Sequence, residues 1–458
     1  MKSVSKLLVA NRGEIACRIM RTCREMGIAT VAVHSEADAN AMHVASADMA
    51  MAIGPAPAAK SYLNVEAILD AAAKSGADAV HPGYGFLSEN ANFARAVAAA
   101  GLTWVGPAPG AIEAMGDKER ARGIAVACDV PVLPGSERFA GEDRGTLEAA
   151  AGQVGFPLLV KAAAGGGGIG MRVVGDAADL PAQVETTQKL AGRTFGDPSV
   201  YLERYVPNAR HVEVQVFGFG NGEGVHLHDR DCTVQRRFQK IIEEAPAPGL
   251  PDAVRSRLHE AALSLVRQQK YLGAGTVEFI YDCDREEVYF LEMNTRIQVE
   301  HTVTEMITGT DLVRWQIEAA TGLLTSPSQV QVRPAGHSIE CRIYAERPEK
   351  NFLPSPGTLE VLHFPPGADD LRVDTGVREG DRITPYYDPM IAKVIAKGAD
   401  RGAAIDRMRE ALSQTEIAGV GTNLAFLLEV LDDADFRDMR VTTRFIETRQ
   451  ARAKQAAA

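Results

Sequence analysis

The first hundred residues alternate between short apolar runs and longer segments in which apolar residues recur at helical spacing. The runs predict buried strands at Leu7–Ala10, Ala29–Val33, Ala77–Val80 and Leu102–Val105. The longer segments predict helices at Glu14–Met26, Val65–Ala73 and Asn92–Ala100. Strands that alternate with helices indicate a Rossmann-like α/β unit, in which helices cover both faces of a parallel sheet.

Binding sites of such sheets lie beyond the carboxyl ends of the strands. The loops there are Asn11–Gly13, His34–Glu36 and the long glycine-rich segment His81–Glu89. The last is equally consistent with a plain connecting loop and with a ligand loop. No Gly-x-Gly-x-x-Gly follows the first strand, so the sequence gives little support to dinucleotide binding.

A smaller unit follows a helical linker. Pro157–Lys161 and Arg172–Val174 predict strands on either side of the loop Ala162–Met171, which contains four consecutive glycines, Gly165–Gly168. Ordering four glycines costs backbone entropy, whereas their exposed N–H groups can surround phosphate oxygens. Lys161 adds a positive charge beside them. We therefore expect a mobile phosphate-covering lid, although its sequence is not that of a P-loop.

Two later segments predict a hairpin that carries acidic side chains. Gly275–Asp282 and Glu287–Glu292 have strand composition, and Cys283–Glu286 joins them. A turn centred near Arg285 places Glu278 opposite Glu292, with Asn294 on the same face. Two opposed carboxylates repel each other, and oxygen ligands of this kind suit Mg²⁺ or Mn²⁺. The alternative is a solvated hairpin with acids placed by chance.

The remaining chain predicts antiparallel strands and a few helices. Arg230, Arg236, Arg237 and Lys240 cluster in one short stretch, which indicates either an anion pocket or an ion-pair network. A further strand is predicted at Glu340–Tyr344, where the charged Arg342 lies between apolar neighbours. Asp374–Ala396 alternates as antiparallel strands do. Helices are expected at Arg401–Gln414 and Asn423–Leu431, and disorder at Arg449–Ala458.

Composition narrows the function classes. The chain has 458 residues, enough for two to four domains, and a net charge of −11, which argues against nucleic-acid binding. Its six cysteines are scattered without a Cys-x-x-Cys pair, which is typical of a reducing compartment. We expect no membrane span and a cytoplasmic location.

These motifs resemble the biotin carboxylase component of biotin-dependent acyl-CoA carboxylases, a branch of the ATP-grasp superfamily. The resemblance rests on Ala10–Ile15, His81–Asn90, Arg230–Cys232, Gln235–Arg237, Glu243–Pro246, Glu292–His301 and Pro385–Lys393. It implies an N-terminal α/β domain (1–115), a helical linker (116–130), an ATP-grasp lid (131–205), a catalytic domain (206–330), a C-terminal α+β domain with an antiparallel sheet (331–448) and a disordered tail (449–458).

The resemblance also implies roles for single residues. It assigns ATP binding to Lys118, Lys161, Gly165, Gly166, Gly167, Gly168, Glu203, Tyr205, His211 and Gln235, and metal binding to Glu278, Glu292 and Asn294. It assigns bicarbonate binding to Lys240, Arg296, Gln298 and Val299. Glu300 would be the general base, Arg342 would stabilise the biotin enolate, and Tyr84 would line the biotin pocket.

The implied reaction uses ATP, bicarbonate, a divalent metal ion and biotin. Glu300 would take a proton from bicarbonate, which attacks the γ-phosphate to give carboxyphosphate. This intermediate releases CO₂ and phosphate, and the phosphate deprotonates biotin. Exclusion of water by the lid would prevent waste of carboxyphosphate. The implied partners are a biotin carboxyl carrier protein or domain and a carboxyltransferase subunit, in a homodimer or larger complex.

Three positions depart from the family pattern. Phe238 stands where many relatives have His, and Ile169 where Arg or Lys is usual, so both would weaken ATP binding. Thr302 replaces a usual Pro, which would loosen the turn after Glu300. Two other functions compete with this one: an ATP-grasp ligase that joins an acyl phosphate to an amine, and a non-catalytic nucleotide-binding subunit. Neither needs the Arg296–Glu300 run together with Arg342.

Biotin in this class is carried on the lysine of a Met-Lys-Met type hairpin, and the single Met-Lys pair here is Met1-Lys2. We therefore predict that the chain carries no covalent biotin and acts on a separate carrier. A free-standing subunit and part of a longer polypeptide both remain open. Avidin blotting after co-expression with a biotin ligase should give no band at the mass of this chain, and a biotinylated band there would refute the prediction.

Overall fold

The N-terminal part of the chain is built on a five-stranded parallel sheet in the order β3-β2-β1-β4-β5. The computed structural model describes residues 1–458 except 1–3, 140–143, 164–169, 237–238 and 457–458. The strands are β1 (Lys6–Val9), β2 (Ala29–Ser35), β3 (Met49–Gly54), β4 (Ala79–His81) and β5 (Thr103–Trp104). The helices are α1 (Gly13–Glu25), α2 (Met42–Ser46), α3 (Val65–Ser75) and α4 (Ala91–Ala99). The predicted parallel sheet is confirmed.

The edge strand β3 was not predicted from the sequence. Its residues Met49–Gly54 consist of methionine, alanine, one isoleucine and one glycine, and only Ile53 is buried. Methionine and alanine favour helices and do not mark a strand, so the pairing with β2 decides the conformation.

At the opposite side of the sheet, Gly83 has φ +62°, and a Cβ there would meet the Asn11 side chain at 2.9 Å. Glycine thus brings the His81–Glu89 loop against β1.

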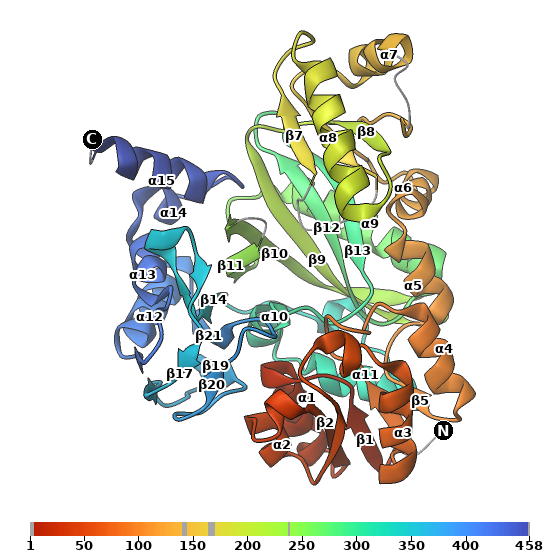
Figure 1. The fold of residues 1–458 in the computed structure, drawn as a ribbon, viewed down its shortest axis with the longest axis vertical. Coiled ribbons are helices and arrows are strands. Elements are labelled where there is room, and N and C mark those ends of the chain that lie inside the picture. Colours follow the sequence, from red (N-terminus) through yellow and green to blue (C-terminus); the bar gives the residue numbers. More distant parts are fainter. Residues whose placement is uncertain (1–3, 140–143, 164–169, 237–238, 457–458) are drawn as a thin grey trace.

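Helices α5 (Pro109–Gly116) and α6 (Lys118–Ala127) lead into a small unit with its own apolar core. Its three strands, in the order β7-β6-β8, are β6 (Leu158–Ala162), β7 (Met171–Val174) and β8 (Val200–Arg204). Helices α7 (Arg144–Val154) and α8 (Leu180–Phe195) pack with this sheet, and the unit lies at the top of Figure 1. The glycines Gly165–Gly168 and Ile169 lie outside the described residues.

An eight-stranded sheet in the order β13-β12-β9-β10-β11-β14-β21-β19 joins the middle of the chain to its C-terminal part. Neighbouring strands run antiparallel throughout. The strands are β9 (Ala209–Phe219), β10 (Gly224–Arg236), β11 (Gln239–Ala245), β12 (Leu272–Asp282), β13 (Glu287–Asn294), β14 (His337–Tyr344), β19 (Leu371–Thr375) and β21 (Met390–Gly398).

The two faces of this sheet have different neighbours. Val212, Val214 and Val216 of β9 share an apolar cluster with helix α9 (Asp252–Gln269). The residues between them, Glu213 and Gln215, contact Arg230 on the other face, where helix α10 (His301–Thr308) lies. The strand alternation therefore separates an apolar face from a polar one.

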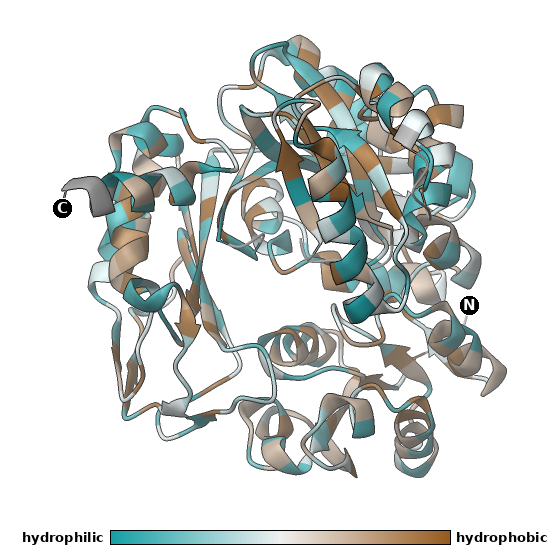
Figure 2. Cartoon of the chain, turned by 45° about the horizontal axis from the view of Figure 1, so that its top comes forward, coloured by the Kyte–Doolittle hydropathy of each residue, from teal (hydrophilic) through white to brown (hydrophobic). Residues whose placement is uncertain are grey.

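Helix α11 (Leu312–Thr321) and the C-terminal elements complete the fold. Short strand pairs are β15 (Glu346–Arg347) with β16 (Leu353–Pro354), β17 (Gly357–Thr358) with β20 (Arg382–Ile383), and β18 (Val361–His363) with β22 (Glu416–Ala418). Helices α12 (Arg401–Ser413), α13 (Leu424–Asp432), α14 (Ala434–Arg437) and α15 (Phe445–Ala456) follow. Figure 2 shows hydrophobic and hydrophilic residues following one another along the strands and helices.

The expected disorder of the last residues, 449–458, is wrong for the part that the structure describes, because α15 continues to Ala456. The segment lacks apolar periodicity but is rich in alanine, arginine, lysine and glutamine, which favour helices. Arg449 also contacts Glu429 at 3.0 Å, and Arg452 contacts Asp435 at 3.2 Å. The other domain limits stay a prediction. No helix among the described residues is long and apolar enough to cross a membrane.

Salt bridges connect the N-terminal part to the C-terminal part. Glu305 of α10 pairs with Arg18 of α1 and with Arg372 of β19, each at 2.8 Å. At the same junction Gly376 packs against the start of α1, and a Cβ there would lie 2.3 Å from the backbone nitrogen of Glu14. Because backbone cannot move aside as a flexible side chain can, only glycine fits.

We therefore predict that Gly376→Ala lowers the free energy of unfolding by about 1–3 kcal/mol, the usual cost of overpacking. Urea denaturation measures the change. The matched control is Gly123→Ala in α6, where a Cβ meets no atom within 4 Å and where alanine should stabilise the helix by roughly 0.5–1 kcal/mol. A Gly376→Ala variant as stable as the parent would contradict this account of the junction.

Candidate active site

The acidic hairpin has the register that the sequence predicts. Glu278 of β12 pairs with Glu292 of β13, and Thr276 pairs with Asn294. The turn is stabilised by Asp282, whose Oδ1 accepts hydrogen bonds from the N–H groups of Asp284 (3.0 Å) and Arg285 (3.3 Å). Asn294 Nδ2 donates to Glu278 Oε1 at 2.9 Å. The three oxygen-bearing side chains thus lie on one face of the sheet.

The two carboxylates differ in their electrostatic surroundings. Burial alone would raise the pKa of Glu278, but Lys240 and His211 hold it well below the usual value. Burial and the charge of Glu278 raise the pKa of Glu292, against the opposing charge of Lys118. A divalent cation between the two would remove this repulsion, and carboxylate and amide oxygens are the donors that Mg²⁺ takes. The donor set therefore fits a hard metal ion.

Lys240 lies at the centre of the buried carboxylates. Its Nζ contacts Glu213 at 2.7 Å, Glu278 at 3.0 Å and Glu300 at 2.6 Å. The lysine comes from β11, the first two carboxylates from β9 and β12, and the last precedes α10. A single ammonium group thus links the acidic hairpin to Glu300.

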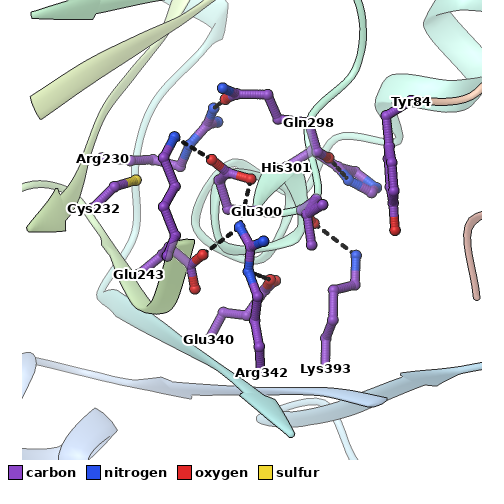
Figure 3. Close-up of polar contacts among 12 residues, drawn as sticks. Tyr84, Arg230, Cys232, Glu243, Gln298, Glu300, His301, Glu340, Arg342 and Lys393 are labelled. Atoms are coloured by element: carbon purple, nitrogen blue, oxygen red, sulfur yellow. Dashed lines mark hydrogen bonds and ion pairs between the residues drawn. The ribbon is translucent and has the colours of Figure 1, made fainter. Parts of the chain in front are cut away.

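Glu300 lies between Lys240 and Arg342, as Figure 3 shows for the arginine. The distance from Arg342 NH2 to Glu300 Oε2 is 2.9 Å, and the same guanidinium also contacts Glu243. Burial favours the neutral acid, but Lys240, Arg342 and Arg230 hold the pKa of Glu300 far below its usual range. The carboxylate is therefore ionised and available as a proton acceptor.

The other predicted bicarbonate ligands surround the same space. Arg296 contacts Glu89 at 3.0 Å and donates to Asn294 Oδ1 at 2.9 Å. Gln298 Nε2 donates to Glu278 Oε1 at 2.8 Å. The carbonyl oxygen of Val299 accepts a hydrogen bond from Lys393 Nζ at 2.7 Å. The structure thus brings the Arg296–Glu300 run against the hairpin.

The predicted ATP ligands fall into two groups. Lys161 and Glu203 pair at 2.7 Å on neighbouring strands of the small unit, and the N–H of Tyr205 donates to Pro157 O at 3.1 Å. Gln235 and His211 form a second group, 2.9 Å apart, and His211 Nε2 lies 3.0 Å from Glu278.

Lys118 is exposed at the start of α6. Gly165–Gly168 and Phe238 lie outside the described residues, as does Arg237 of the predicted basic cluster. The described members of that cluster, Arg230, Arg236 and Lys240, form ion pairs with carboxylates.

Tyr84 donates its hydroxyl proton to Glu14, and Glu14 lies 3.4 Å from the buried Lys393. In Figure 3 the tyrosine stands to one side of Arg342 and Glu300. Lys393 itself is 0% exposed, so its ammonium depends on these partners. The loop His81–Glu89 therefore meets the site through Glu14 and Lys393.

Sequence reasoning named Arg230 as a member of the basic cluster but missed two of its buried partners, Glu213 and Gln215. Arg230 is 0% exposed and donates to Glu213 (2.5 Å), Gln215 (2.7 Å) and Gln298 (2.6 Å). Polar residues at alternate positions of β9, between buried valines, are the signal that could have found Glu213 and Gln215. Thr302, expected to loosen its turn, instead lies buried in α10 and donates a hydrogen bond to Glu340.

Fold and site together define an ATP-binding enzyme, and comparisons with known proteins agree. Residues 117–326 match the family model of the carbamoyl-phosphate synthase L chain ATP binding domain. Residues 3–112 and 340–448 match the biotin carboxylase N-terminal and C-terminal domains. The chain belongs to the biotin carboxylase family.

Three relatives illustrate the similarity. Biotin carboxylase 1 of Bacillus subtilis is 48% identical over 97% of this chain and 98% of its own length. The mitochondrial methylcrotonoyl-CoA carboxylase subunit alpha of Oryza sativa subsp. japonica is 50% identical, and this chain spans 61% of its length. The biotin carboxylase domain dimer of Hydrogenobacter thermophilus 2-oxoglutarate carboxylase, solved with MgADP, ADP and bicarbonate, superposes with a TM-score of 0.91 at 45% identity over 98% of both chains.

The carboxyl group of Glu243 provides a pH test of this buried site. Burial, together with the charges of Glu340 and Glu300, raises the pKa of Glu243 to about 8 despite Arg342. An acid whose pKa is higher in the folded state keeps its proton there after the unfolded chain has lost it. The contribution of protonated Glu243 to the free energy of unfolding is therefore complete below the pKa that this group has in the unfolded chain. This contribution is lost as the pH rises towards 8, at no more than about 1.4 kcal/mol per pH unit.

We predict that Glu243→Gln flattens the decline in the free energy of unfolding between pH 5 and pH 8, because glutamine does not titrate. Urea denaturation at several pH values measures the slope, so a uniform loss of stability from the substitution does not affect the result. Glu349→Gln, an exposed position, is the matched control. Equal slopes in the parent and Glu243→Gln would show that Glu243 is ionised in the folded protein.

Proposed function

We propose that this chain carboxylates biotin on a separate carrier protein or domain, with ATP and bicarbonate, as the first half-reaction of an acyl-CoA carboxylase. The observation that carries the proposal is the placement of Glu300 between Lys240 and Arg342, at 2.6 and 2.9 Å. A proton acceptor thus lies between two cations that can hold anionic reactants. The hairpin of Glu278 and Glu292 adjoins it through Lys240.

Bicarbonate would bind among Lys240, Arg296, Gln298 and the backbone of Val299. Glu300 would accept its proton, so that a bicarbonate oxygen attacks the γ-phosphate of ATP and yields carboxyphosphate and ADP. A base works best when its pKa lies near the working pH, whereas the two cations depress that of Glu300. An anion that takes over contacts of Lys240 would weaken this effect and make Glu300 a stronger base.

Lys118, Lys161 and the hairpin would hold the nucleotide. Against burial, Glu203 and Tyr201 raise the pKa of Lys161, so its ammonium remains charged. The lysine would exchange Glu203 for phosphate oxygens, and Glu203 and Tyr205 would then face the adenine. Glu278, Glu292 and Asn294 would hold Mg²⁺ or Mn²⁺, which supplies charge neutralisation to the phosphates when bound.

Carboxyphosphate would release CO₂ and phosphate, and the phosphate would take the N1 proton of biotin. Arg342 would then stabilise the enolate that captures CO₂. Its guanidinium already pairs with the carboxylate of Glu300 and contacts the carboxyl group of Glu243, so it is preorganised for negative charge. Tyr84, on the loop that meets Glu14, would line the biotin pocket.

The partners follow from this chemistry. A biotin carrier must reach Arg342, and a carboxyltransferase must use the carboxybiotin; we place the reaction in the cytoplasm. The chain spans about three fifths of the methylcrotonoyl-CoA carboxylase relatives, so the acyl substrate belongs to the complete enzyme. ADP release that requires bicarbonate and rises with free biotin, without an amine, distinguishes this function from that of an amine ligase.

We predict that Glu300→Gln lowers bicarbonate-dependent ATP hydrolysis by about 10²–10⁴-fold, the usual contribution of a general base. The affinity for ATP should change little, because Glu300 lies beyond the hairpin. Coupled ADP-release assays measure turnover, and calorimetry measures binding. Glu349→Gln serves as the control for an exposed glutamate. Turnover near that of the parent would remove Glu300 from the base role.

A further inference from the structure

Three histidines meet on the apolar side of the central sheet, away from Glu300. His226 and His228 come from the start of β10, and His259 comes from the middle of α9. The rings of His226 and His259 stack with centroids 3.8 Å apart, and that of His228 lies 5.8 Å from His259. One nitrogen from each ring lies within 4.8 Å of the other two. All three side chains are half-buried.

Two of these rings are oriented by hydrogen bonds at Nε2. His259 Nε2 lies 2.9 Å from Asp229 Oδ2, and His228 Nε2 lies 3.2 Å from the carbonyl oxygen of Val332. An oxygen acceptor at Nε2 requires the proton there, which leaves a lone pair on Nδ1. Histidines that bind metal ions are usually fixed in this way, by a carboxylate or a carbonyl behind the ring.

The third ring offers a nitrogen lone pair as well. His226 Nδ1 accepts a hydrogen bond of 3.4 Å from the N–H of His228, a long contact that a metal ion could replace. A ring nitrogen that accepts a hydrogen bond carries the lone pair with which neutral imidazole binds metal ions.

The backbone at this place is irregular in a way that gathers the rings. The register of β10 against β9 shifts between His226 and Asp229, and His228 has φ +66°. Regular alternation would already place residues 226 and 228 on one face, but the irregularity also lets Asp229 reach α9. Asp229 is buried there against Arg255 and His259.

We infer that His226, His228 and His259 form a binding site for a zinc ion that joins β10 to α9, a site separate from the proposed catalytic centre. Three imidazole nitrogens are a donor set that zinc accepts and that magnesium avoids. The nitrogens must approach to about 3.3–3.5 Å for tetrahedral geometry with Zn–N distances near 2.0–2.1 Å, so the stacked rings of His226 and His259 would have to turn towards a common point. The fourth position is left to water.

In the described part of the chain, two other groups of side chains could compete for zinc, and both belong to the polar face. They are His211 with Glu213 and Glu278, and Glu213 with Cys232 and Glu300. Lys240 already contacts Glu213, Glu278 and Glu300, and a cation at their centre disfavours a second one. Among the residues that the structure describes, no ammonium group contacts the three histidines, and Asp229, which also pairs with Arg255, lies directly behind His259.

The test uses the untagged full chain, stripped with a chelator and then titrated with zinc chloride in excess magnesium chloride. Competition with a colorimetric zinc indicator and elemental analysis should give about one equivalent of zinc per chain. His259→Gln and His226→Phe should each weaken binding about ten-fold or more. His211→Gln and the exposed His363→Gln should bind zinc as the parent does.

A second measurement separates lost binding from lost folding. Zinc should raise the thermal unfolding midpoint of the parent and of His211→Gln, but not that of His259→Gln, because a ligand stabilises only the state that binds it. Circular dichroism checks that each variant is folded. The inference is overturned if the parent binds no zinc, if His259→Gln and His226→Phe both bind it fully, or if His211→Gln abolishes binding.

Discussion

The structure depends on one constraint: several full charges lie out of water, and each must have a partner. Arg230, Lys240 and Arg342 meet Glu213, Glu278 and Glu300 in a single connected group on the polar face of the central sheet. Removing one member of such a group leaves an uncompensated charge, which typically costs about 3–5 kcal/mol. Because buried charges are so costly, stabilisation alone explains their presence poorly, whereas a function that uses them explains it well.

The sheet makes this arrangement possible because its strands bring charges from distant parts of the sequence to one place. Valines of β9 face α9, while Glu213 and Gln215 face Arg230. β11 brings Lys240, β14 brings Arg342, and the loop before α10 brings Glu300. The C-terminal part thus contributes to the site, since the arginine proposed to stabilise the enolate comes from it. Glu305 and Gly376 fix that part against α1, so contacts at this distant junction help to position the part of the chain that carries Arg342.

Local patterns were sufficient to predict much of the fold and part of the site. Apolar runs and helical spacing located β1, β2, β4 and α1, and a four-residue turn was enough to pair Glu278 with Glu292. The edge strand β3 and the helix α15 were missed because their alanine-rich composition carries no strand or amphipathic signal. Contacts such as Arg230 with Gln298, 68 residues apart, could not be predicted, because they depend on register between strands that are distant in sequence.

Thr302 shows how the network also restrains the start of α10, directly after Glu300. The hydroxyl donates to Glu340, whose pKa is raised to about 7, chiefly by burial. Glu340 lies two residues before Arg342 on β14, and its carboxylate is 3.9 Å from the Arg342 guanidinium. A hydroxyl donor can hold the carboxyl group of Glu340 in place without adding charge. Proline has no donor, so the threonine replaces backbone rigidity with a side-chain bond between α10 and the strand that carries Arg342. The start of α10, and with it Glu300, is then positioned by the same strand as its partner arginine.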